Sequence, residues 1–152
     1  MRGGIYKIYF DSCCWGRSQD DHRDAEIYKE NDAILKIIVH ARTYGYPVYG
    51  SLVIEEEINA NRDEVKREKV MSFYNRTITA KSGYVESVFN YVRPIARGAG
   101  IRGRDVFHLC HAIACGADYL ITTDKDFLKA SSKLILPLIV INPLKFPLGG
   151  AI

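Results

Sequence analysis

Apolar residues recur along the chain with two spacings, and each spacing predicts a type of secondary structure. Short runs rich in β-branched and aromatic residues predict four strands, at Ile5–Asp11, Pro47–Ser51, Asp118–Thr123 and Leu134–Ile141. Apolar positions three to four residues apart predict helices at about 24–44, 52–59, 61–77, 79–97, 105–115 and 126–130. We expect Pro94 to kink or end its helix, and the tail from Asn142 to be irregular.

Predicted strands alternate with predicted helices, which is typical of right-handed βαβ units and a parallel sheet. The 152 residues contain no repeat, low-complexity segment or linker, and this length suits one domain with a substantial core. The pattern therefore predicts a single α/β domain over residues 1–152.

Composition narrows the class of protein only slightly. A formal net charge of +3 permits a nucleic-acid partner without requiring one. No apolar run is long enough to span a bilayer, and no signal peptide is recognisable, so we expect a cytoplasmic protein with no membrane partner. The cysteines lack the C-x-x-C spacing of zinc sites and are expected to be reduced, small apolar residues: Cys13, Cys14, Cys110 and Cys115.

Acidic residues stand where the predicted strands end. Asp11 ends the first strand, and Asp124 follows the third, with Asp126 two residues later. Asp105 opens a helix after a glycine-rich loop, and Glu57 lies on the helix that follows the second strand. Because ligands of open parallel sheets bind beyond the carboxyl ends of the strands, these acids can converge on one edge.

Convergence of carboxylates is unfavourable without a cation. Two carboxylates about 4 Å apart repel each other by roughly 4 kcal/mol at an effective dielectric constant of about 20. Either one is protonated or a metal ion neutralises them. An all-oxygen ligand set suits Mg²⁺ or Mn²⁺ rather than zinc, and such a site can activate a water and bind a phosphate oxygen. The pattern therefore favours phosphodiester hydrolysis.

Each acid also has a purely structural interpretation. The aspartates can act as helix caps or turn residues, and Glu57 belongs to a run of three glutamates that can form a solvated helix face. Helical geometry places Glu57 beside Val53, Ile54 and Ile58 on the buried side, although a shift of one residue would give its role to Glu56. The hypothesis of a metal site therefore depends on the whole set of acids.

Four segments carry the candidate acids in a fixed order along the chain: Ile8–Arg17 (IYFDSCCWGR), Ser51–Ile58 (SLVIEEEI), Gly103–Ala114 (GRDVFHLCHAIA) and Gly116–Phe127 (GADYLITTDKDF). Together and in this order, they resemble the PIN-domain family of bacterial and archaeal toxin-like ribonucleases. The fourth is the most specific, because Thr-Thr-Asp-x-Asp-Phe after a strand is a strong mark of the family. The resemblance covers most of the chain, from about Ile5 to Ile141.

The resemblance implies a three-layer α/β/α fold whose central parallel sheet has four to five strands. It implies a catalytic and metal-binding site of Asp11, Glu57, Asp105 and Asp124, with Asp126 as an accessory ligand, that holds Mg²⁺ or Mn²⁺. The implied activity is that of a metal-dependent endoribonuclease that cleaves single-stranded RNA. Many small bacterial members resemble toxins of toxin–antitoxin pairs and are dimers, so an antitoxin and a second copy of the chain are the implied partners.

Other residues can support this site. Thr122 and Thr123 can support a metal-bound water, and Ser12 can do the same, since Thr123 and Ser12 flank predicted ligands. His108 lies three residues after Asp105 on the same helical side, where it can orient a carboxylate, although we favour a hydrogen-bonded core histidine. Trp15 is expected in the core rather than stacked on a base. Basic residues expected to contact RNA phosphates are Arg17, Arg93, Arg97, Arg102 and Arg104.

Rival classes of protein make distinguishable demands on the sequence. A PIN-like module that binds RNA or a protein without cutting it remains open, although the presence of all four acids argues for activity. A haloacid-dehalogenase-like phosphatase needs a second Asp where this chain has Cys13. A receiver domain needs its acceptor Asp on a middle strand and a later Lys, and this layout does not fit. The P-loop pattern of nucleotide-binding proteins does not occur in the sequence.

Overall fold

The structure is a computed structural model that describes residues 4–148. Within this range, five short strands form one sheet in the order β3-β2-β1-β4-β5, and every pairing is parallel. The strands are β1 (Ile8–Phe10), β2 (Val48–Gly50), β3 (Ala80–Lys81), β4 (Tyr119–Ile121) and β5 (Ile139–Ile141). The predicted α/β class with a parallel central sheet is confirmed.

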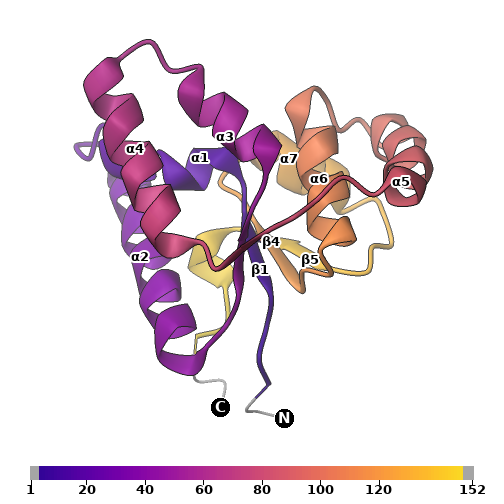
Figure 1. The fold of residues 1–152 in the computed structure, drawn as a ribbon, viewed down its shortest axis with the longest axis horizontal. Coiled ribbons are helices and arrows are strands. Elements are labelled where there is room, and N and C mark those ends of the chain that lie inside the picture. Colours follow the sequence, from indigo (N-terminus) through magenta and orange to yellow (C-terminus); the bar gives the residue numbers. More distant parts are fainter. Residues whose placement is uncertain (1–3, 149–152) are drawn as a thin grey trace.

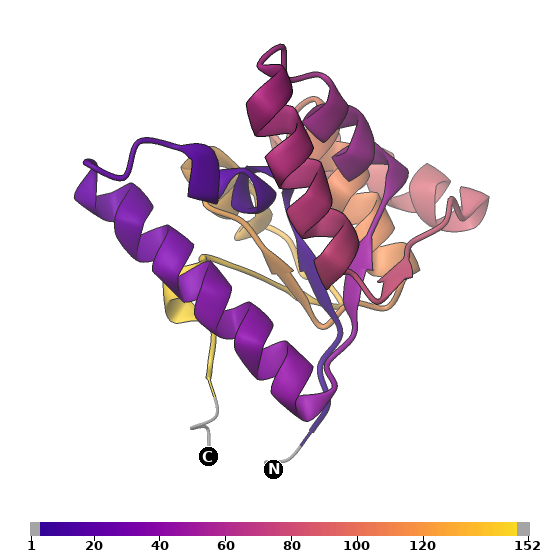
Figure 2. The same cartoon turned by 60° about the vertical axis from the view of Figure 1, so that its left-hand side comes forward.

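Helices flank the sheet on both sides, and Figures 1 and 2 both place α2 and α5 on opposite sides of the strands. This arrangement follows from right-handed crossovers, because the chain first moves outward from β1 to β3 and then returns to β4 and β5. The helices are α1 (Ser12–Trp15), α2 (Ala25–Tyr44), α3 (Leu52–Asn59), α4 (Glu64–Thr77), α5 (Glu86–Gly98), α6 (Arg104–Ala114) and α7 (Lys125–Ser131), with 3₁₀ turns η1 (Arg17–Gln19) and η2 (Pro143–Lys145).

Capping side chains set the starts of α3 and α7, which follow β2 and β4. Ser51 Oγ accepts the N–H of Ile54 at the start of α3, and Asp124 accepts the N–H groups of Asp126 and Phe127 at the start of α7. These contacts satisfy N–H groups that have no partner within their own helix. The two helices therefore begin directly at the carboxyl ends of β2 and β4.

The core lies against the two central strands, β1 and β4, whose residues are all buried. Trp15 is 1% exposed and packs edge-to-face against Phe10, Phe73 and Tyr74. The expected core position of Trp15 is confirmed, which excludes a role in stacking on a base.

The segment predicted as one helix from Thr79 to Arg97 is instead a strand followed by a helix. The N–H of Thr79 donates to Val48 O at 2.8 Å and that of Ser82 to Gly50 O at 2.7 Å. These bonds to β2 hold Ala80–Lys81 as an edge strand, so the helix begins only at Glu86. Pro94 does not end this helix, which continues to Gly98.

Other predicted bounds also need correction. The expected first strand, Ile5–Asp11, pairs only over Ile8–Phe10, and the four-residue helix α1 that follows was not predicted. The expected last strand, Leu134–Ile141, pairs only over Ile139–Ile141. A proline at position 137 has no N–H to donate to a neighbouring strand, which limits pairing before Ile139.

Among the helices of residues 4–148, none combines the length and the apolar character needed to cross a membrane. The four cysteines are all free: Cys14 and Cys110 are buried, and Cys13 and Cys115 are half-buried.

Gly50 provides a test of how the core positions the start of α3. A Cβ at Gly50 would lie 2.1 Å from the hydroxyl oxygen of Tyr74 and 2.7 Å from its Cζ. Tyr74 is fully buried, so it has little room to move. We expect Gly50→Ala to lower the free energy of unfolding by about 2–3 kcal/mol in urea denaturation, the usual cost of overpacking a core.

Gly83→Ala is the matched control, because a Cβ at Gly83 would meet nothing within 4 Å. We expect it to change stability by about 0.5 kcal/mol or less. Equal stability of the two variants would show that Tyr74 does not pack tightly against Gly50.

Candidate metal centre

Asp11 lies at the carboxyl end of β1, next to the end of β4. Its N–H donates to Ile121 O at 2.9 Å, and the hydroxyl of Thr122 donates to Asp11 Oδ2 at 2.7 Å. The Asp11 side chain is only 6% exposed. The two central strands therefore hold this carboxylate at the edge of the sheet, under the loops that follow both strands.

Glu57 approaches Asp11 from α3. Its Oε1 accepts a hydrogen bond from Ser12 Oγ at 2.6 Å. Ser12, which the sequence suggested as a supporting residue, therefore contacts a predicted ligand. Glu56 instead is exposed and pairs with Arg104 at 3.3 Å. The structure therefore directs Glu57, and not the alternative Glu56, towards the other acids.

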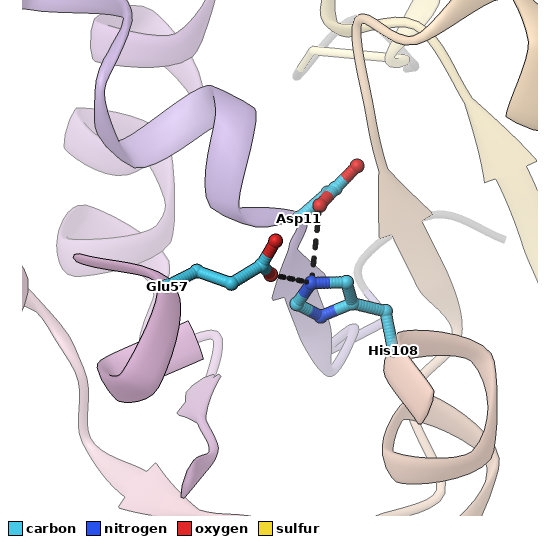
Figure 3. A group of neighbouring side chains, drawn as sticks. All are labelled: Asp11, Glu57 and His108. Carbon is cyan, nitrogen blue, oxygen red and sulfur yellow. Dashed lines mark hydrogen bonds and ion pairs between the residues drawn. The ribbon is translucent and has the colours of Figure 1, made fainter. Parts of the chain in front are cut away.

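His108 joins these two carboxylates from α6 (Figure 3). Its Nε2 lies 2.5 Å from Glu57 Oε1 and 3.4 Å from Asp11 Oδ1. Its Nδ1 lies 2.8 Å from the hydroxyl of Tyr9. His108 is fully buried and hydrogen-bonded, as expected of a core histidine, and it also faces the acids.

Donor atoms of Asp11, Glu57 and His108 all lie within 4.8 Å of one another. In the part of the chain that the structure describes, the spacing of these two acids and one histidine suits a metal ion. Carboxylate oxygen and imidazole nitrogen are both ordinary metal ligands, so these residues fit a divalent cation.

Asp105 lies in the first turn of α6 and is half-buried. Burial raises the pKa of its carboxyl to about 7, assisted by the negative charges of Asp11 and Asp124 and opposed by His108. Asp105 is outside the close group of three, yet it shares the electrostatic field of the other acids. At neutral pH a large fraction of this carboxyl is protonated when no cation is bound.

Asp124 has a structural role as well as a place near the site. Its Oδ1 accepts the N–H groups of Asp126 at 2.9 Å and Phe127 at 3.1 Å, so Oδ2 is not used by the cap. Asp126 is exposed in the first turn of α7. Both aspartates line a cavity of about 480 Å³ together with Asp105.

Charge pairing shifts the pKa values of Glu57 and His108 in opposite directions. Burial alone would raise the pKa of Glu57, but hydrogen bonds from His108 and Ser12 outweigh it and lower the pKa. Burial alone would lower the pKa of His108, but Glu57 and Asp11 outweigh it and raise the pKa. The attraction between the two side chains therefore favours the charged form of each.

The hydroxyl beside Asp11 belongs to Thr122 rather than to Thr123. The Thr123 hydroxyl accepts a hydrogen bond from Arg17 at 3.0 Å and lies 3.1 Å from Cys13 Sγ. Thr122 instead contacts Asp11 and also accepts the N–H of Asp124 at 3.0 Å. Of the two threonines predicted to support the site, Thr122 is the one that contacts Asp11.

The predicted RNA-contacting arginines divide into different groups. Arg17 forms an ion pair at 2.9 Å with the buried Glu30, so it supports the fold and is not free to contact RNA. Arg93 and Arg97 lie near Cys110 on α6. Their charges lower the pKa of the Cys110 thiol, but burial has the larger effect and raises it to about 11. Arg104 pairs with Glu56.

Basic residues line the cavity that contains Asp105 and Asp124. Arg102 is one of them and was predicted; Lys129 and Lys133 were not. These two lysines are four residues apart on the segment that follows Asp124. Their position within ten residues after a predicted ligand is the signal by which the sequence could have identified them.

Comparison with known proteins supports the fold and leaves the activity to be tested. The sequence matches no protein-family model and no curated protein. A similar structure is a chain of VapBC2 from Rickettsia felis, with a TM-score of 0.53. That crystal structure contains VapBC2 bound to a DNA fragment from its promoter. The similarity covers 89% of this chain and 98% of that chain at 17% sequence identity, so it shows a common fold.

Asp105 allows a test of the crowding of the acids. A carboxyl whose pKa is higher in the folded than in the unfolded chain destabilises the fold as the pH rises between the two values. The free energy of unfolding of the metal-free protein should therefore fall as the pH rises from about 4, the ordinary value for Asp, to about 7. We expect Asp105→Asn to be more stable than wild type by about 1–2 kcal/mol at pH 8 in EDTA, since solvent screens this half-exposed group.

The measurement is urea denaturation at pH 5 and pH 8, with Asp32→Asn as control. Asp32 is exposed and pairs only with Lys36 at 3.0 Å, so its loss should change stability by about 0.5 kcal/mol. If Asp105→Asn were no more stable than Asp32→Asn at pH 8, the raising of the Asp105 pKa by burial and by neighbouring negative charges would be contradicted.

Proposed function

We propose that this protein is a metal-dependent endoribonuclease of the PIN type that cleaves single-stranded RNA. The observation that carries the proposal is the meeting of acids from separate elements at the carboxyl edge of the sheet. Asp11 follows β1, Glu57 lies on α3, Asp105 opens α6 and Asp124 follows β4. The fold shared with the VapBC2 chain and the sequence resemblance to PIN domains support the same conclusion.

The proposed ligands of Mg²⁺ or Mn²⁺ are Asp11, Glu57, Asp105 and Asp124, with Asp126 as an accessory residue. Burial, assisted by the charges of Asp11 and Asp124, raises the pKa of Asp105, and a bound cation would relieve both effects. A bound divalent cation would supply Lewis-acid polarisation of a phosphate oxygen and lower the pKa of a water.

The chain itself fixes the carboxylates before any ligand arrives. Thr122 holds one oxygen of Asp11, and Ser12 holds one oxygen of Glu57. Fixed orientation reduces the free energy needed to organise the site during the reaction. Asp105 must lose its proton to act as a ligand, so cation affinity should increase with pH up to about 7.

The cavity beside the acids is the proposed binding site for the RNA backbone. Its lining includes the acidic residues Asp105 and Asp124 and the basic residues Arg102, Lys129 and Lys133. Basic side chains bind phosphates, while the acids bind the cation that contacts the scissile phosphate. An antitoxin protein is a proposed partner, supported by the VapBC2 complex in which the similar chain was found. A second copy of the chain is a further proposed partner, on the resemblance to PIN-domain toxins alone.

The proposed activity is tested by cleavage of a pool of labelled single-stranded RNAs in Mn²⁺ or Mg²⁺. We expect wild type to cut and EDTA to abolish cutting. Asp11→Asn should cut at least about 100-fold more slowly, because several kcal/mol of charge stabilisation depend on the cation. Glu57→Gln should behave in the same way.

Glu56→Gln is the control for this assay, because Glu56 is exposed and points away from the other acids. It should cut at the wild-type rate. Cutting in excess EDTA, or an undiminished rate in Asp11→Asn, would refute the proposed site. Metal binding without cutting of any RNA would favour the non-catalytic binding module.

The proposed RNA-binding role of the cavity lysines is tested by fluorescence anisotropy with a labelled single strand at several salt concentrations. Lys129→Ala combined with Lys133→Ala should weaken binding and reduce the slope of log affinity against log salt by about one to two. Lys36→Ala is the control, since Lys36 is on α2 and pairs with Asp32. An unchanged slope in the double variant would place the RNA elsewhere.

A further inference from the structure

His108 occupies an unusual position for a buried histidine. It is fully buried, yet its Nε2 points at two carboxylates rather than at a single acceptor (Figure 3). Nε2 lies 2.5 Å from Glu57 Oε1 and 3.4 Å from Asp11 Oδ1, with Ser12 Oγ at 3.3 Å. The nitrogen is therefore placed where three oxygen atoms of the site converge.

The imidazole ring is held in this orientation from its other side. Nδ1 lies 2.8 Å from the Tyr9 hydroxyl, which in turn lies 2.8 Å from Ser51 Oγ. Ser51 Oγ also accepts the N–H of Ile54 and so caps α3, the helix that carries Glu57. Tyr9 and Ser51 are both fully buried. Metal-binding histidines usually have their second nitrogen fixed by such a hydrogen bond.

This hydrogen-bonded chain is compatible with a metal-binding tautomer. Tyr9 can accept a hydrogen bond from Nδ1–H and donate its own hydrogen to Ser51 Oγ, which leaves the Nε2 lone pair directed at the acids. A lone pair facing two carboxylates is repelled by them, so Nε2 needs either a proton or a cation between it and the oxygens. A divalent cation satisfies all three groups at once.

The distances between the ligand atoms of Asp11, Glu57 and His108 suit coordination of one shared ion. Ligand atoms about 2.1 Å from one ion, at right angles to each other, lie about 3.0 Å apart. The separation of 3.4 Å between His108 Nε2 and Asp11 Oδ1 is close to that value. Glu57 Oε1 is closer, and its side chain is 31% exposed, so it has room to move outward by a fraction of an ångström.

We propose that His108 Nε2 is a direct ligand of the cation, beside Asp11 and Glu57, so that the site is a mixed nitrogen–oxygen centre that prefers Mn²⁺ to Mg²⁺. Imidazole nitrogen binds transition metals well, whereas Mg²⁺ strongly prefers oxygen ligands. This inference rests on the proposed function, because it concerns the same cation, and it identifies a ligand that an all-carboxylate centre lacks.

The direct test is pulsed electron paramagnetic resonance of the whole protein loaded with Mn²⁺ alone. We expect ¹⁴N modulation from one imidazole bound to Mn²⁺, replaced by the ¹⁵N pattern when the protein is made with ¹⁵N-labelled histidine. His108→Gln should lose the nitrogen coupling while still binding Mn²⁺. His22→Gln is the control, because His22 is exposed and its Nε2 lies 3.2 Å from the backbone oxygen of Arg17 rather than at the site, and it should keep the coupling.

Calorimetric titration tests the metal preference without any RNA. His108→Gln should bind Mn²⁺ about 10- to 100-fold more weakly, and Mg²⁺ less than about threefold more weakly. Tyr9→Phe should keep the nitrogen coupling but lower Mn²⁺ affinity a few-fold, because it removes the hydrogen bond to Nδ1. The wild-type spectrum decides the matter even if His108→Gln does not fold.

The outcomes separate this inference from the proposed function. Mn²⁺ bound by wild type without nitrogen coupling would overturn His108 as a ligand, and it would leave the carboxylate centre and the nuclease proposal standing. Failure of wild type to bind Mn²⁺ or Mg²⁺ at all would overturn both. Nitrogen coupling together with absent RNA cleavage would support the ligand and refute the nuclease.

Discussion

Repulsion among carboxylates at one edge of the sheet is the constraint around which this protein is organised. Asp11 is nearly buried at the end of β1, and Glu57 and His108 lie against it. Glu57 and Asp11 raise the pKa of His108 against the effect of burial, and burial together with Asp11 and Asp124 raises that of Asp105 to about 7. The hydroxyl groups of Thr122 and Ser12 donate hydrogen bonds to two of the carboxylates. Like charges gathered at a partly buried place cost stability that an apolar core would not lose, which is typical of functional sites.

The core and the site are parts of one hydrogen-bonded structure. Tyr9, in the middle of β1, contacts His108 on α6 and Ser51 at the start of α3. Ser51 also donates its N–H to the buried Tyr74 hydroxyl, which fits only because Gly50 has no side chain. Packing around the central strands therefore determines where Glu57 and His108 lie, and this supports pre-organisation of the site.

Much of the fold could be predicted from the sequence because strand and helix periodicities are local properties. The two-residue strand β3 could not, since it exists only through its bonds to β2. The acids were identifiable because strand ends meet in parallel sheets, although their ligand role stays a prediction. Local spacing placed His108 on the side of Asp105, but it could not give the contacts themselves. The hydrogen bond of His108 with Glu57, the ion pair of Arg17 with Glu30 and the hydrogen bond from Thr122 to Asp11 join segments that are distant in the sequence.

The central claim, that these acids form a divalent-cation site, is tested most directly by anomalous X-ray diffraction from crystals of the protein equilibrated with Mn²⁺. The account predicts an anomalous peak at the carboxyl edge of the sheet, within coordination distance of Asp11 and Glu57. Saturating Mn²⁺ with no peak at these residues, in crystals where their carboxylates are well ordered, would contradict it.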